Sequence, residues 1–140
     1  RHLMRIAMRL AALALALALA LALLPAAALA DGAVPVTLPT LPVVDDPASY
    51  DSLLSDLVIA NVISSNCPGY EITNGEWGML TGTADMVAAA MGLSTEVYDS
   101  NYYGPAFDVL DDPNACALYG PTVRPMLDLI ASWGGRPTVK

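Results

Sequence analysis

An uninterrupted apolar run from Leu10 to Leu24 decides how much of this chain can take part in a fold. Three arginines precede the run, and small residues ending in Ala28-Leu29-Ala30 follow it. A charged region, a short apolar core and a small-residue cleavage site are the three parts of a secretory signal peptide. A membrane-spanning helix needs roughly 20 apolar residues, and this stretch reaches that length only if the residues through Ala30 are included. An uncleaved membrane anchor therefore stays open as the alternative. We therefore predict a signal peptide over residues 1–30 and a mature chain that is periplasmic or secreted.

The predicted mature chain is strongly acidic. It keeps all 14 acidic residues, whereas its basic residues are Arg124, Arg136 and Lys140. Nucleic-acid binding is excluded, because proteins that neutralise phosphates need clustered Lys and Arg side chains. The same charge disfavours adhesion to anionic lipid, and we expect no stable membrane insertion after signal cleavage. The composition leaves a protein partner of unknown identity as the expected partner, with no cofactor.

Both cysteines of the sequence, Cys67 and Cys116, lie in the mature chain. Export places them in an oxidising compartment, where an even pair of cysteines in a small domain usually forms a bridge. The alternative is a reactive thiol, but no Cys-x-x-Cys spacing and no nearby His or Lys supports it. We predict a structural Cys67–Cys116 disulfide.

The rest of the mature chain has the pattern of a small all-α bundle of four to five short helices behind an extended N-terminal strap. Three prolines in the strap, residues 31–45, forbid a helix and favour an extended path, and its apolar residues indicate that part of it lies across the helical core. Residues 46–140 then form one helical domain. Asp46-Pro47 and Asp112-Pro113 are helix-start signals, because Asp caps free amides and the first turn of a helix needs no donor from Pro.

Turn signals divide this domain into its helices. We expect helices at 47–65, from 73 or 74 to 91, at 94–102 and from 114 towards 133, with a turn or short helix at 106–110.

Glycine and proline set three further expectations. Gly104-Pro105 is expected to end the third helix, and Gly120-Pro121 and Pro125 to kink or restart the last one. Three glycines of the second helix, at positions 75, 78 and 82, are each expected to weaken it by roughly 1 kcal/mol relative to Ala.

No pattern in the mature chain predicts a catalytic residue, and we predict that the protein is not an enzyme. The mature chain contains no histidine, so Ser-His-Asp and Cys-His pairs cannot form. Glu71 and Glu76 flank the turn before Trp77, and an aromatic side chain beside two acids is how a sugar-cleaving site could look. A weak carboxylate-based hydrolase is therefore kept as an alternative function.

Acidic side chains could also bind cations. In the pairs Asp45-Asp46 and Asp111-Asp112, however, helix capping explains one member and the positive helix amino end favours the other. Residues 99–104, DSNYYG, start like a calcium loop, but Tyr103 stands at its fifth position and Leu110 at its twelfth, where ligands are needed. We predict no metal site and keep a cation-binding protein as a second alternative.

The densest aromatic cluster consists of Tyr98, Tyr102, Tyr103 and Phe107. Tyr98 and Tyr102 are one helical turn apart and are expected on one face. Such clusters are core in most small domains and a partner surface in a minority. We take these four residues as the candidate partner surface of an exported, non-catalytic accessory or protein-interaction module.

Three short motifs also carry a resemblance: Asn66-Cys67-Pro68, Gly92-Leu93-Ser94 and Cys116-Ala117-Leu118. In these the chain resembles a family of small exported all-helical proteins of unknown function from alphaproteobacteria. The resemblance implies a periplasmic helical domain without an assigned activity. The chain departs from the family pattern at Pro121 and Pro125, where such a family keeps a continuous helix.

Overall fold

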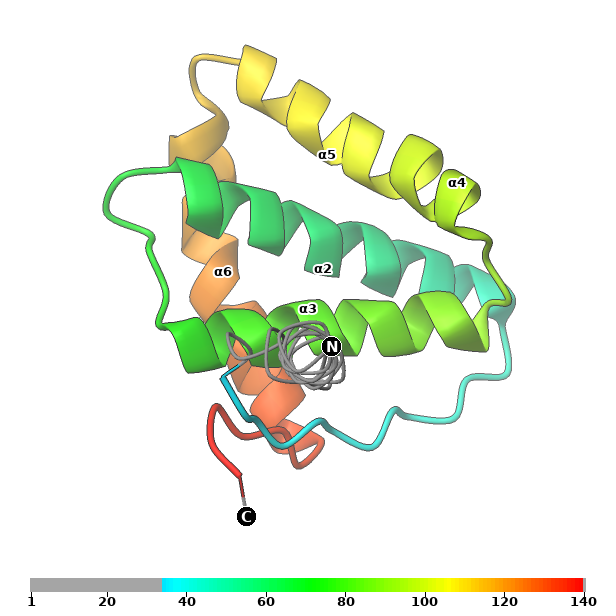
Figure 1. Ribbon diagram of the computed structural model, residues 1–140. Helices are drawn as coiled ribbons and strands as arrows, with labels where there is room; N and C mark the ends of the chain where they lie inside the picture. Colours follow the sequence, from blue (N-terminus) through cyan, green and yellow to red (C-terminus); the bar gives the residue numbers. More distant parts are fainter. Residues whose placement is uncertain (1–33, 140) are drawn as a thin grey trace, which may run out of the picture. The chain divides into compact units, whose positions relative to one another are not determined.

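The first helix after the strap is the central helix of the bundle, because the later helices pack against it. In the computed structural model, which describes residues 34–139, this helix is α2, Pro47–Asn66 (Figure 1). The Asp46 carboxylate accepts a 3.0 Å hydrogen bond from the Ala48 amide, which confirms the predicted start. Side chains from Ala60 to Ser64 are all buried, because other helices cover this half of α2 on every side. The expected signal peptide, residues 1–30, lies outside the described residues.

The second helix, α3, spans Asn74–Ala90. Thr73 and Glu76 form a capping box at its start, in which the Thr73 side chain accepts from the Glu76 amide and the Glu76 carboxylate accepts from the Thr73 amide. Gly92 follows the end of the helix with a φ of +69°, which favours glycine. The predicted boundaries of α3 are confirmed.

The third helical run is longer than expected. It consists of α4, Thr95–Tyr98, the π-helical turn η2, Asp99–Tyr103, the helix α5, Gly104–Asp108, and the 3₁₀ turn η3, Val109–Asp111. The run passes alongside α2 without interruption (Figure 1). The prediction that Gly104-Pro105 ends the helix was wrong. The π turn closes a bond from the Gly104 amide to the Asp99 carbonyl, and Pro105, which has no N–H, follows directly where the helix returns to α geometry.

The last helix, α6, spans Ala115–Ser132. The Asp112 carboxylate accepts a 2.8 Å hydrogen bond from the amide two residues later, that of Asn114, as Asp46 does from Ala48. Asp46 directly precedes α2, whereas Asp112 lies three residues before α6. Of the expected kink or restart at Gly120-Pro121 and Pro125, the restart is wrong, since both prolines lie inside one helix. Both are exposed, so the carbonyls left without an N–H partner face water, while the buried side of α6 packs against α2.

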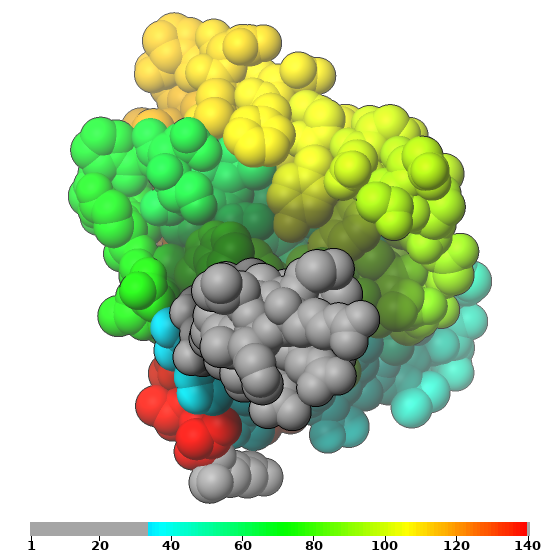
Figure 2. Space-filling model, viewed as in Figure 1, coloured from blue at the N-terminus to red at the C-terminus, as the bar shows by residue number. Residues whose placement is uncertain are grey.

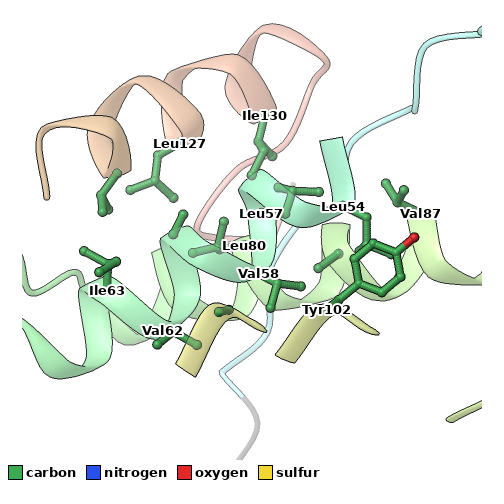
Figure 3. Packing of buried hydrophobic residues seen from close by; sticks show 14 of the residues in the cluster. Leu54, Leu57, Val58, Val62, Ile63, Leu80, Val87, Tyr102, Leu127 and Ile130 are labelled. Atoms are coloured by element: carbon green, nitrogen blue, oxygen red, sulfur yellow. The ribbon is translucent and has the colours of Figure 1, made fainter. Parts of the chain in front are cut away.

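The predicted disulfide is confirmed. Cys67, the C-cap residue of α2, is bonded to Cys116 in the first turn of α6, with a Cα–Cα distance of 5.4 Å. It fixes the end of one central helix to the start of its neighbour. Figure 3 shows part of the core, to which α2, α3 and α6 contribute Leu57, Leu80 and Ile130.

Residues 34–45, the described part of the proline-rich strap, are extended and cross the bundle, as expected. Thr37 exchanges two 2.9 Å backbone hydrogen bonds with Arg136, so the strap pairs with the chain that follows α6. It also lies against α3, where a Cβ on Gly82 would come within 2.5 Å of the Leu38 side chain and one on Gly78 within 3.4 Å of Val36. Gly78 and Gly82 therefore allow the strap to pack close to the α3 backbone, a role that their low helix propensity does not reveal.

The all-α prediction is confirmed for residues 34–139, where β pairing is limited to the bridge between Thr37 and Arg136. Among the helices of this range, none combines the length and the apolar character needed to cross a membrane.

Candidate functional site

The π-helical turn η2 determines how the aromatic cluster is arranged. In an α-helix, residues five apart point about 140° away from each other, because each turn holds 3.6 residues. A π turn is wider and closes bonds between residues five apart, which brings such residues towards one side. The rings of Tyr98 and Tyr103 accordingly lie 5.2 Å apart between centroids, tilted by 44°. The structure thus adds Tyr103 to the face that Tyr98 occupies.

Two of the three tyrosines are fixed by carboxylates on other helices. The Tyr98 hydroxyl donates a 3.1 Å hydrogen bond to Asp85 of α3, and the Tyr102 hydroxyl donates a 2.5 Å bond to Asp51 of α2. Tyr98 and Tyr102 also pack edge to face, with centroids 6.4 Å apart. These contacts fix the positions of the Tyr98 and Tyr102 rings.

Asn61, a buried polar residue of α2, positions the third tyrosine. Its side-chain amide donates to the Tyr103 hydroxyl over 3.1 Å, and its side-chain carbonyl accepts from the Trp77 indole N–H over 2.9 Å. One asparagine therefore connects α2, α3 and η2. A polar residue inside an apolar helical stretch was the only sequence signal for this role.

Between α3 and the α4–η2 run lies a cavity of about 430 Å³, which we call the tyrosine groove. Figure 2 shows the side of the molecule on which this helical run, coloured yellow-green to yellow, is exposed. The lining consists of small and apolar residues, aromatic rings and carboxylates: Asp85, Ala88, Ala89, Leu93, Thr95, Tyr98, Asp99 and Tyr103.

The charge of the groove comes from its aspartates. Burial, together with the neighbouring Tyr103 and the Asp85 carboxylate, raises the pKa of Tyr98 well above its ordinary range. The hydrogen bond to Asp51, with burial, raises the pKa of Tyr102 to about 12. Both phenols therefore stay neutral at physiological pH. In the part of the chain that the structure describes, the ion pair is Arg124–Glu76, and neither Asp85 nor Asp99 belongs to it.

The four predicted partner-surface residues have different surroundings. Tyr102 is 9% exposed and belongs to the core, Tyr98 and Tyr103 are half-buried in the tyrosine groove, and Phe107 is 53% exposed on α5 outside the groove lining. Their role as a partner surface stays a prediction. Sequence reasoning missed Asp85, because only the packing of α3 beside α4 brings it to the tyrosines.

The carboxylates considered for catalysis serve local structure. Glu71 accepts a 2.9 Å hydrogen bond from the Gly69 amide. Glu76 completes the capping box of α3 and accepts a hydrogen bond from Arg124 of α6. That bond from the Arg124 guanidinium is the main cause that holds the pKa of Glu76 below its usual value.

The acidic patterns considered for cation binding, the two Asp-Asp pairs and residues 99–104, also have roles in local structure. Asp46 accepts a backbone amide at the start of α2, which confirms the capping interpretation for the first pair. Asp112 accepts the Asn114 amide in the turn before α6 and does not cap that helix, because its N-cap residue is Asn114, which forms no side-chain cap bond, so the capping interpretation of the second pair was wrong. Residues 99–104 are helical and form no ligand loop. Across residues 34–139, no three His, Cys, Asp or Glu side chains are placed to hold a metal ion together.

Comparisons of this chain with protein-family models, with curated proteins and with solved structures give no match. The resemblance to the alphaproteobacterial family stays a prediction, and the functional argument rests on the tyrosine groove.

Proposed function

We propose that this chain is an exported, non-catalytic interaction module that receives a protein partner in the tyrosine groove. The observation that carries the proposal is a cavity of about 430 Å³ that joins two tyrosine rings with two carboxylates. Aromatic side chains are enriched at protein interfaces, where they contribute large contact areas. The lining contains no His, Cys or Lys side chain, so it offers no activated thiol, imidazole or amine.

The hydrogen bonds of the tyrosines support a binding role. Tyr98 is fixed to Asp85 and Tyr103 to Asn61, so neither ring needs to be ordered when a partner binds. A preorganised surface loses less side-chain entropy on association, which increases affinity.

Export is supported by two independent features. The amino-terminal segment has the charged, apolar and small-residue parts of a signal peptide. The Cys67–Cys116 disulfide belongs to a class of bond that persists in oxidising compartments and is rare in the cytosol. We place the mature protein in the periplasm or outside the cell.

A photo-crosslinking experiment tests this function. A photoreactive amino acid replaces Thr95 at the tyrosine groove in one variant and Ser132, an exposed residue of α6, in the control. After irradiation in the native envelope, we expect one discrete covalent adduct from the Thr95 variant and none from the Ser132 variant. N-terminal sequencing of the adduct should begin at Asp31 if the chain was exported and cleaved. Equal adducts at both positions, or none at Thr95, would contradict the proposal.

A further inference from the structure

We infer that the tyrosine groove binds a basic side chain of the partner protein, an arginine in preference to a lysine, between Asp85, Asp99 and the rings of Tyr98 and Tyr103. This inference rests on the proposed function and specifies the chemistry of the partner at the same site.

The first argument is charge complementarity. Asp85 comes from α3 and Asp99 from η2, so carboxylates from two elements line one hollow. Both side chains are exposed, and two neighbouring like charges on a surface attract a side chain of opposite charge. Within residues 34–139 the basic side chains are engaged elsewhere: Arg124 pairs with Glu76, and Arg136 donates to backbone carbonyls near the end of α6. A cation that neutralises the groove must therefore come from outside this part of the chain.

The second argument is the state of the aromatic rings. The Tyr98 hydroxyl already donates to Asp85, and the Tyr103 hydroxyl already accepts from Asn61. What the two side chains offer a partner is mainly their ring surface, and cations are attracted to ring faces within about 6 Å of the centroid. A tilt of 44° at a centroid distance of 5.2 Å leaves the two rings far from a closed face-to-face stack.

The third argument is the remaining lining. Ala88, Ala89 and Leu93 supply small and apolar surface beside the carboxylates. A long basic side chain needs this combination, because its methylene stem packs on apolar surface while its charged end meets acceptors. The guanidinium of arginine is planar, can bond a carboxylate through two N–H groups and stacks on aromatic rings, whereas the ammonium of lysine is a compact, strongly hydrated charge.

An NMR titration of the isotope-labelled protein tests the inference directly. The probe is an acetylated, amidated alanine pentapeptide with one central arginine. Its matched control carries citrulline, which has the same shape without the charge, and a third peptide carries lysine. We expect saturable shifts of the Ala88, Ala89 and Asp99 amides with the arginine peptide, weaker binding of the lysine peptide, and citrulline binding that is weaker by about tenfold or more.

Charge variants separate the groove from the overall acidity of the protein. Asp85→Asn/Asp99→Asn removes two charges inside the groove and should weaken arginine binding by about tenfold. Asp108→Asn/Asp111→Asn removes two exposed charges outside the groove lining and should leave the affinity unchanged. Equal losses in both double variants would show that net charge alone attracts the peptide, which would overturn the inference.

A ring variant tests the aromatic contribution. Tyr103→Leu should weaken binding by about fivefold, the scale of one exposed cation–π contact. Phe107→Leu, which removes an exposed ring outside the groove lining, should not change it. The same spectra report whether each variant is folded. If a partner crosslinks at Thr95 while the arginine and citrulline peptides bind equally well, the proposed function as an interaction module is supported. The inference that the groove binds a basic side chain is then refuted.

Discussion

Removal of the Cys67–Cys116 bridge is expected to reduce the free energy of unfolding by about 4 kcal/mol. The two cysteines are separated by 49 positions, and the chain-entropy relation gives about 4 kcal/mol at 25 °C for a loop of this length. The effect acts on the unfolded chain, which gains conformations when the bridge is absent, while the contacts of α2 with α6 can persist in the folded state. A loss of this size is comparable with the whole net stability of a small domain.

The perturbation is Cys67→Ala/Cys116→Ala, measured by urea unfolding against the oxidised wild type. Alanine is chosen because Cys67 is 2% exposed, and a serine there would bury a hydroxyl and add an unrelated cost. With a urea slope of about 1–3 kcal/mol per molar, the midpoint should fall by about 2 M. The slope itself should rise, because an unfolded chain without the loop exposes more surface.

The wild type under reducing denaturation provides a control without any substitution. It should match the alanine variant in midpoint and slope, and the variant should not respond to reductant. Losses below about 1 kcal/mol in both proteins would refute the argument that the bridge constrains the unfolded chain. A loss in the variant alone would instead assign the cost to the cavity left by the sulfur atoms.

Two further predictions concern α3. Gly78→Ala should raise the thermal midpoint of unfolding, because its Cβ would lie at an ordinary contact distance of 3.4 Å from Val36 and alanine improves helix propensity by about 1 kcal/mol. Gly75→Ala should lower the midpoint, because the new Cβ would overlap the Pro137 carbonyl. Equal shifts in the two variants would contradict the described packing of α3 against the strap at Gly78 and against Pro137 at Gly75. The pKa of Glu76 is lowered in the folded protein from its ordinary value of 4.5. The pair of Glu76 with Arg124 should therefore contribute its full stabilisation of the folded state above pH 4.5, and this contribution should be lost as the pH falls below that value. Urea midpoints between pH 7 and pH 3 should therefore fall more steeply for the wild type than for Arg124→Ala, and parallel curves would refute the linkage.

The helix starts were predictable because their causes are local. Asp46-Pro47 places a side-chain acceptor two residues before a free amide, and Thr73 with Glu76 satisfies two backbone donors within one turn. Such contacts depend on neighbours in the chain and need no knowledge of packing. The disulfide was predictable for another reason, since a chain with two cysteines has one possible intramolecular pairing.

The candidate site was predictable only in part. The aromatic cluster is visible in the sequence, but the partner of Tyr98 on α3, Asp85, lies 13 positions away and meets it through helix packing. Tyr103 shares the face of Tyr98 because of a π turn, which the expected α-helical spacing does not contain.

The sequence by itself determined where α2 and α3 begin, which cysteines pair and that the chain is acidic. Only the tertiary structure decided that α6 continues through Pro121 and Pro125 and that the third run continues through Pro105. Each proline removes one backbone hydrogen bond, a local cost of about 3 kcal/mol in a helix interior. Burial of the opposite side of α6 against α2 and the disulfide at its start offset that cost, and both depend on residues far away in the chain.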